Sequence, residues 1–485
     1  MNLKIIFYIL SRLCSGFAWA MVAPVAVALY YGEDAYKYFL CAIAIIFCLA
    51  VIFKRYGCEE DLRDISIREG IGTVFFTWIL CAIMASLPYA FSGILDPISS
   101  YFESMSGLST TGATAIENLD VIPHCIFFWR SMTHWIGGIG IIVLFVALLP
   151  QIAGGAVYLF TAEVSGFSSD RILPRIRTTA VALFYIYLLL TVILMGTLIL
   201  SGLSEFEAIN HAFATIATGG FSIYNDSVGY FNNPLIEFVI AIFMILAGCN
   251  FALYYNIIHS GVKSLWQDLE FKIYITIITV ATIIITINIV HANGYSVLQG
   301  LRYAFFQVAS FTSTTGFVSC NYDNWPSFSK LILAVMYFSG GCAGSTAGGI
   351  KICRFIVLMK TTLVEIRRTL HPQTLPNVYY SKKIVTVPVI MNISQFFYMY
   401  ILVITVLAIG MSATGLPVEE AIFGVAACVS SVGPAFGSLG AEGNYAGITS
   451  MGKIILSFGM VLGRLELFTV LALLRGEFWS TSKRW

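Results

Sequence analysis

Ten long apolar segments divide this chain, and they constrain its fold more than any other feature. Each is close to, or longer than, the roughly 20 residues that a helix needs to cross a bilayer. Hydrophobic residues make up 58% of the sequence and charged residues 11%, which excludes an ordinary soluble globule. The sequence therefore predicts an all-α polytopic membrane protein. The segments lie at 5–31, 36–53, 71–92, 125–149, 178–201, 234–258, 273–291, 329–359, 384–413 and 449–474.

Four shorter, moderately apolar stretches lie between the third and fourth, fifth and sixth, seventh and eighth, and ninth and tenth segments. They are too short to cross the bilayer and are typical of re-entrant helices. Each begins with a helix start signal, such as a capping residue, a first-turn proline or first-turn acids. The signals are Asp96 before Pro97, Ser204 with Glu207, Ser296 with Gln299, and Pro417 before Glu419 and Glu420.

Each short stretch ends in a tract of small residues. The tracts read "STTGAT" (109–114), "IATGGF" (216–221), "STTGFV" (313–318) and "SSVGPA" (430–435). Their central glycines, taken as Gly112, Gly219, Gly316 and Gly433, are 107, 97 and 117 residues apart. This spacing predicts four repeats of span, short helix, glycine tract and span. A simpler alternative stays open, in which the glycines only let helices pack closely.

The tracts have a physical explanation if they surround one axis. Irregular backbone at membrane depth is tolerated only where it lines water or is buried in protein. Glycine allows positive φ angles that turn carbonyl oxygens toward the axis, and the negative helix ends favour a cation there. We therefore expect a selectivity filter of backbone carbonyls. Its predicted residues are Thr110, Thr111, Gly112, Ala113, Ala217, Thr218, Gly219, Gly220, Thr314, Thr315, Gly316, Phe317, Ser431, Val432, Gly433 and Pro434.

Charge placement predicts the orientation of the chain. Basic residues gather in alternate connections, most densely between Lys351 and Lys383, whereas the tract-bearing connections hold almost none except Arg302. The positive-inside rule then places both termini in the cytoplasm and the tracts toward the outside. Acidic residues are expected to concentrate cations at the outer mouth. They are Glu103, Glu117, Asp120, Glu205, Glu207, Asp226, Asp323, Glu419, Glu420 and Glu442.

The eighth segment contains a second glycine-rich stretch, "SGGCAGSTAGGIK" (339–351). It is not a phosphate loop, because Lys351 is not followed by Ser or Thr and no strand precedes it. The stretch predicts a break in the helix, which needs a cavity beside it. We expect the break to act as a gate, although a packing kink remains an alternative. The predicted gate residues are Gly340, Gly341, Gly344, Ser345, Thr346, Gly348 and Gly349.

Arg464 lies within the tenth segment, where an arginine costs about 2.5 to 3.5 kcal/mol at a helix centre. Such a residue usually faces a pore or a partner, and we expect it to complete the gate. The alternative is an arginine that extends to the cytoplasmic surface. Glu466 is no obvious intrahelical partner for it, because residues two apart do not face each other.

Other chemistry finds little support in the sequence. The 11 cysteines form no CxxC pair and show no zinc-ligand spacing with histidine. His124 and His134 flank an outer span entry, and His211 and His259 are expected to be hydrogen-bonded structural residues. No catalytic constellation is present, and nothing favours an enzyme or nucleic-acid binding. A cation-coupled secondary solute symporter stays open as an alternative, although such proteins usually contain two inverted halves.

These tracts and segments resemble the TrkH/KtrB/HKT superfamily of potassium transporters over nearly the whole chain. The resemblance implies two extra N-terminal spans (1–66) and four repeats of span, pore helix and span (67–175, 176–268, 269–372 and 373–485). Glycine in all four tracts goes with potassium preference in this superfamily. The fourth tract, "SSVGPA", departs most from the pattern, so equal coordination by the four repeats is not expected.

The resemblance also implies partners and a location. It implies a homodimer in the bacterial inner membrane, docked on a cytoplasmic ring of nucleotide-binding TrkA subunits. The break at 340–349 would lie beneath the filter as a gate, and Arg464 would repel cations in the pore below it. Potassium would be the transported ion, held by filter carbonyls, with no covalently bound cofactor. Coupling of the flux to protons or sodium stays open.

Overall fold

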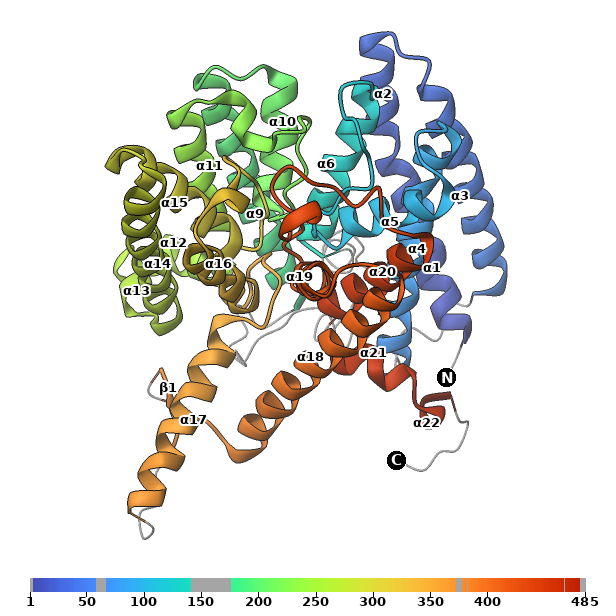
Figure 1. Cartoon of the computed structure of the whole chain (residues 1–485). Coiled ribbons are helices and arrows are strands. Elements are labelled where there is room, and N and C mark those ends of the chain that lie inside the picture. Colours follow the sequence, from blue (N-terminus) through green and yellow to red (C-terminus); the bar gives the residue numbers. More distant parts are fainter. Residues whose placement is uncertain are drawn as a thin grey trace.

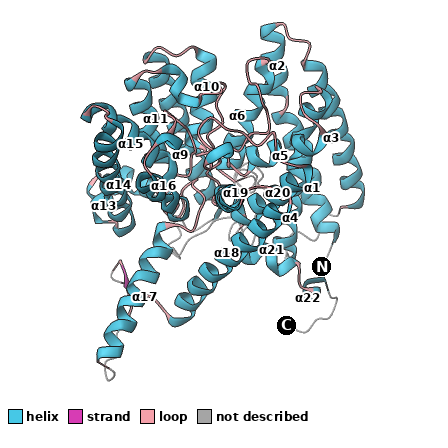
Figure 2. Cartoon of the chain, in the orientation of Figure 1, coloured by secondary structure: helices cyan, strands magenta, loops and turns pink. Residues whose placement is uncertain are grey.

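The structure is a computed structural model, nearly all helical, that describes residues 3–57, 67–140, 176–371, 377–381, 383–465 and 467–479 (Figures 1 and 2). It begins with α1 (Leu3–Ala20), α2 (Val22–Tyr31) and α3 (Tyr36–Tyr56). The first group that follows is α4 (Ile67–Phe91), α5 (Pro97–Leu108) and α6 (His124–Gly138). The second is α9 (Ile176–Leu200), α10 (Glu205–Ile216), η3 (Ser227–Phe231), α11 (Pro234–Ala247), α12 (Phe251–Ser260) and α13 (Lys263–Gln267).

The C-terminal half continues the same plan. The third group is α14 (Leu269–Asn293), α15 (Val297–Thr312), η4 (Tyr322–Asn324), α16 (Ser327–Ser339) and α17 (Ile352–Leu370). The strands β1 (Tyr379–Tyr380) and β2 (Lys383–Ile384) form a short antiparallel pair with Tyr379 opposite Ile384. The last group is α18 (Val387–Ala413), α19 (Val418–Val429), η5 (Gly437–Leu439), α20 (Ser450–Arg464), α21 (Leu467–Leu473) and α22 (Gly476–Trp479).

Helices occupy all ten predicted segments, but fewer run straight through. Within the described residues, six helices are long and apolar enough to cross a membrane, or eight if each of two bent pairs is one span. The predicted break of the eighth segment is present between α16 and α17. In the fourth segment, α6 ends at Gly138, and residues 141–149 lie outside the described part of the chain.

Two further breaks were not expected from the sequence. The sixth segment bends by 93° between α11 and α12, and the tenth by 116° between α20 and α21. In the sixth segment the Gly248 carbonyl accepts from the Cys342 N–H at 2.8 Å, and Asn250 starts a new helix by accepting a hydrogen bond from the Ala252 N–H at 2.9 Å. Gly248 has no room for a side chain, because a Cβ there would overlap Tyr274. The prediction of continuous spans was therefore wrong at both places.

The four short helices, α5, α10, α15 and α19, start where the sequence signals place them. Asp96 accepts hydrogen bonds from the N–H groups of Ile98 and Ser99, and Ser204 with Glu207 forms a complete capping box. For α15, Ser296 accepts from the Gln299 N–H, which is one half of the expected box. Pro417 precedes α19, whose first turn holds Glu419 and Glu420.

The short helices link neighbouring groups. Each packs on the helices that flank it in sequence and also on a helix of the preceding group: α10 on α6, α15 on α11, α19 on α16, and α5 on α20. The contact between α5 and α20 joins the first group to the last, so the four groups follow one another in a circle. The N-terminal helices α1, α2 and α3 lie outside this circle against α4 and α6 (Figure 1).

Candidate functional site

The glycine tracts follow the short helices with one repeated backbone conformation. Each short helix ends at a capping residue with right-handed φ and ψ, namely Ser109, Ala217, Ser313 and Ser430. The next residue is left-handed, although it carries a side chain: Thr110 (φ 57°), Thr218 (53°), Thr314 (56°) and Ser431 (56°). Two positions later a glycine is left-handed again: Gly112 (83°), Gly220 (80°), Gly316 (81°) and Gly433 (90°). Alternation of this kind turns successive carbonyl oxygens to one side.

This register corrects the second tract. The sequence interpretation took Gly219 as the central glycine, but the left-handed glycine is Gly220. Ala217 is the helix cap, which corresponds to Ser109 and not to Thr110. Gly219 is required for another reason: a Cβ there would overlap atoms of the His134 ring. Two glycines in a row, each with a different function, explain why the sequence interpretation chose the wrong register.

The four tracts contact one another in a closed circle. A Cβ added to Gly112 would overlap the carbonyl oxygen of Gly219 in the second tract. The same overlap joins Gly220 to Thr315 in the third tract and Gly316 to Val432 in the fourth. Finally, a Cβ on Gly433 would overlap the Thr111 carbonyl oxygen of the first tract. Each glycine is therefore required by its φ angle and by a neighbouring carbonyl.

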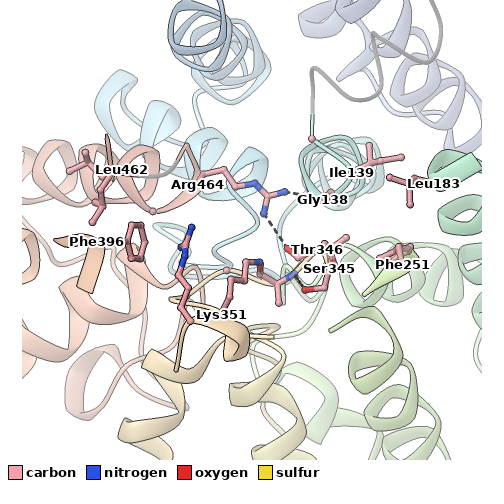
Figure 3. Close-up of a pocket in the computed structure, with 18 of the residues that line it drawn as sticks. Gly138, Ile139, Leu183, Phe251, Ser345, Thr346, Lys351, Phe396, Leu462 and Arg464 are labelled. Carbon is pink, nitrogen blue, oxygen red and sulfur yellow. Dashed lines mark hydrogen bonds between the residues drawn. The ribbon is translucent and has the colours of Figure 1, made fainter. Parts of the chain in front are cut away.

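A cavity lies on each side of this circle. One cavity, which we call the outer one because the sequence predicts that this side faces outward, is lined by tract residues together with Glu117, Asn225 and Glu442. The other, which we call the inner cavity, is lined by Arg464, Lys351, Arg354, Phe396 and residues of the 340–351 loop (Figure 3). The circle of tracts therefore lies between one cavity lined by Glu117 and Glu442 together with Arg130, and another that Arg464, Lys351 and Arg354 line.

The 340–351 loop is bound directly to the tracts from the inner side. The Thr346 hydroxyl donates to the Ile216 carbonyl, at the end of α10, at 3.1 Å. The Gly348 N–H donates to the Thr314 hydroxyl of the third tract at 2.7 Å. A Cβ on Gly348 would also overlap the Ser430 carbonyl oxygen beside the fourth tract. The structure thus brings the predicted gate residues against three of the four tracts.

Arg464 connects the loop to the first tract. Its guanidinium donates to the Thr346 carbonyl at 3.2 Å and to the Thr110 hydroxyl at 3.3 Å. It also donates to the carbonyls of Gly137 at 2.5 Å and Gly138 at 3.1 Å, at the end of α6 (Figure 3). Arg464 therefore lines the inner cavity and bonds to the loop, which disagrees with the alternative of an arginine that extends to the cytoplasmic surface.

Two functional candidates were missed by the sequence analysis. Glu270, at the start of α14, is buried and accepts hydrogen bonds from the Ala343 N–H at 2.8 Å and the Cys353 N–H at 3.0 Å. It therefore binds both ends of the loop region. Arg130 in α6 is 2% exposed and forms an ion pair with Glu103 at 2.9 Å. Charged residues inside otherwise apolar helices were the signal for both.

Glu103 needs a correction as well. It was expected on the acidic outer surface, but it is fully buried. Its carboxylate accepts from the Thr114 hydroxyl and from the Ala115 N–H just after the first tract. Burying a charge is tolerated where a partner and hydrogen bonds compensate it, as Arg130 does here. Glu103 therefore supports the first tract from behind instead of attracting ions from outside.

The histidines have structural contacts where the structure describes them. His134 bonds to the Gly107 carbonyl through Nδ1 and accepts from the Phe221 N–H through Nε2. His124 pairs with Glu33, and His211 contacts Ser222. The side chains of His259 and Glu466 lie outside the described part of the chain. Among the described residues, no three His, Cys, Asp or Glu side chains are grouped to hold a metal ion.

Comparisons with known proteins agree on one family. The TrkH family model, described as cation transport protein, matches residues 38–481. The Trk system potassium uptake protein TrkH of Salmonella typhimurium is 36% identical over 484 residues, covering 99% of this chain and 100% of that protein. TrkG of Escherichia coli K12 is 32% identical over 479 residues, covering 97% and 98%. The crystal structure of the potassium transporter TrkH from Vibrio parahaemolyticus matches with a TM-score of 0.90 at 33% identity, covering 99% and 100%.

Proposed function

The chain belongs to the TrkH family of cation transport proteins, and from this premise we propose that it takes up potassium through a filter of backbone carbonyls. The observation that carries the proposal is the closed circle of four tracts, each with left-handed residues at the same two positions. The filter is formed by residues 110–113, 218–221, 314–317 and 431–434. The relatives are named as potassium uptake proteins, so the solute symporter alternative is not favoured.

The chemistry of such a filter follows from the backbone. A potassium ion sheds water when carbonyl oxygens replace its hydration shell. Four short helices also end at the tracts, and their negative C-terminal dipole ends favour a cation at that point. The transported ion is the cargo, so no catalytic group and no resident cofactor is required.

We further propose the repeat arrangement and orientation that the sequence suggested. Residues 1–66 form the two additional spans, and 67–175, 176–268, 269–372 and 373–485 form the four repeats. The contacts of α5, α10, α15 and α19 with preceding groups support a circular order of the repeats. By the positive-inside rule, the basic residues around the inner cavity support an orientation in the inner membrane in which this cavity and both termini face the cytoplasm.

The gate in this proposal consists of the 340–349 loop together with Arg464. The loop contacts the tracts from the inner side, and Arg464 bonds to both the loop and Thr110. A cation that leaves the filter inward has to pass the guanidinium charge. Movement of α17, which directly follows the loop, would shift the loop and open the path.

Partners follow from the same family assignment. We propose a homodimer docked on a cytoplasmic TrkA-like ring that binds nucleotides. Arg367 and Arg368, in the last turn of the exposed end of α17, are candidates for that contact. Pull-down of cytosolic proteins with wild type and with an Arg367→Gln, Arg368→Gln variant tests this. Equal recovery removes both residues from the interface and leaves attraction to anionic lipid, worth about 1 kcal/mol per basic residue, to explain the charges.

Ion flux into liposomes that hold only the purified chain tests the proposed function. Potassium, sodium and choline gradients are compared, with empty liposomes as the control. We expect potassium flux to exceed sodium flux and choline to be excluded. Equal flux of all three cations would contradict a carbonyl filter.

A further inference from the structure

The short helices present one position to the back of each tract. This position lies seven residues before the left-handed Thr or Ser of the tract. Its counterpart in the tract lies four residues after that same Thr or Ser. The helix-side residues are Glu103, His211, Gln307 and Gly424. The corresponding tract-side residues are Thr114, Ser222, Val318 and Ala435. We call the first set the brace position.

In the first group the brace residue is Glu103, and both oxygens of its carboxylate accept hydrogen bonds. Glu103 accepts from the Thr114 hydroxyl at 3.1 Å, from the Ala115 N–H at 2.8 Å and from Arg130 at 2.9 Å. Arg130 also donates to the Ser222 carbonyl beyond the second tract at 3.1 Å. One ion pair thus fixes the outer ends of two tracts, and charge-assisted hydrogen bonds are the stronger kind.

In the second group the brace is neutral. His211 Nδ1 lies 2.8 Å from the Glu207 carbonyl oxygen, which can only accept, so this nitrogen carries the proton. His211 Nε2 then accepts from the Ser222 hydroxyl at 3.3 Å. This is the same pair of positions that Glu103 and Thr114 occupy, with one weaker hydrogen bond in place of the charged set.

In the third and fourth groups the brace is missing. Gln307 is fully buried, and neither atom of its amide has a hydrogen-bond partner in the described structure. The corresponding tract residue is Val318, which has no hydroxyl to offer. In the fourth group Gly424 has no side chain at all. A buried amide without a hydrogen-bond partner is rare. In the third group the brace residue is therefore present, but the tract residue that would bond to it is not.

We propose that the brace position holds the outer end of the first and second tracts, and that Glu103 and His211 are positioning residues for potassium selection. The inference rests on the proposed function. A filter held at potassium size resists contraction around the smaller sodium ion, and a compliant one does not. The first and second tracts are held from the brace position, whereas the third and fourth are held from other positions. Ser310 donates to the Phe317 carbonyl of the third tract at 2.7 Å. The hydroxyls of Tyr445, Tyr337 and Tyr322 donate to three successive carbonyls of the fourth tract, those of residues 433–435.

Restoring the missing partner is the sharpest test. Val318→Thr adds a hydroxyl at the tract position that corresponds to Thr114 and Ser222, and by that correspondence we expect it to bond to the Gln307 amide. We expect the potassium-to-sodium flux ratio in liposomes to rise about threefold, as a net gain of one hydrogen bond allows. The same substitution in a Gln307→Leu background should give no rise, because the partner is gone. Val318→Ala, which changes packing without a hydroxyl, is the matched control.

Removing the strongest brace is the complementary test. Glu103→Gln should lower the flux ratio by about tenfold, since it removes the charge that Arg130 and Thr114 bond to. If this variant does not fold, the Val318→Thr comparison still decides. A wild-type protein without potassium preference would contradict the proposed function. The proposal about the brace position alone would be overturned by a wild type that prefers potassium and a Val318→Thr variant with the same potassium-to-sodium flux ratio, whether or not Gln307→Leu is also present.

Discussion

The filter tracts and the loop beneath them are both rich in glycine, but they are held in different ways. In the tracts, each glycine faces a carbonyl oxygen of the next tract, so the circle consists of backbone against backbone. In the loop, Arg464, Thr346 and Glu270 supply the main side-chain contacts. A backbone circle is altered most directly by changing its glycines, whereas a loop held by side chains is released by removing one of them. We therefore expect ion preference and flux control to be separable.

The largest expected effect breaks the circle. Gly316→Ser places a Cβ onto the Val432 carbonyl oxygen at a φ of 81°. Forcing this contact should reduce the potassium-to-sodium flux ratio by at least about tenfold, because a left-handed side chain alone costs roughly 1 to 2 kcal/mol. The same substitution at Gly112 should act alike. Gly196→Ser, in α9 with no atom within 4 Å of its Cβ, is the control and should keep the wild-type ratio.

The second effect releases the loop. Arg464→Ala removes four hydrogen bonds, to Thr110, Thr346, Gly137 and Gly138, and the positive charge in the inner cavity. Potassium flux should rise about tenfold without a change of ion preference. Deletion of residues 343–348 should do the same. Arg475→Ala, at an exposed position just after α21, serves as the control, and if both gate variants conduct like wild type, the gate lies elsewhere.

A smaller effect is expected at Glu270. Glu270→Gln keeps the shape but weakens the hydrogen bonds from the Ala343 and Cys353 N–H groups, because its oxygen is no longer charged. Flux should rise about two- to threefold, with ion preference unchanged. Glu365→Gln, on the exposed face of α17, is the matched control. A loss of preference at Glu270 would show that the loop and the tracts are not separable.

The smallest effect lies outside both regions, at Glu33. Burial raises the pKa of Glu33, but hydrogen bonds from Cys125 and His124 outweigh it and lower the pKa below the ordinary value of 4.5. Its stabilising effect is therefore present above about pH 4.5 and is lost as the pH falls through the lowered pKa. Glu33→Gln should lower stability by about 1 kcal/mol at pH 7, as for other helix caps, with flux unchanged. Tm values of the two proteins should converge in acid, and a constant gap would contradict this account.

Local signals in the sequence predicted the helices well. Asp96 and Ser204 start α5 and α10 as expected because capping depends on residues within one turn. The break in the eighth segment was also predictable, since five glycines between residues 340 and 349 cannot continue a helix.

Long-range contacts limited the rest. The sequence cannot distinguish Gly219 from Gly220, because only the distant His134 ring shows which glycine is required for packing. Glu103 reads as a surface acid until Arg130, 27 residues later, is placed beside it. The bend after Gly248 is accompanied by a hydrogen bond from the Cys342 N–H to the Gly248 carbonyl, and Cys342 lies 94 residues later in the sequence.

The most direct test of separable selection and control combines both changes in one protein. Potassium and sodium fluxes are measured in liposomes for Gly316→Ser, Arg464→Ala and the double variant, at equal protein density. Independent sites contribute additively. The account predicts that Arg464→Ala raises flux by the same factor in both backgrounds, and that the double variant has the low potassium preference of Gly316→Ser. A loss of preference in Arg464→Ala alone, or no rise in flux, would contradict it.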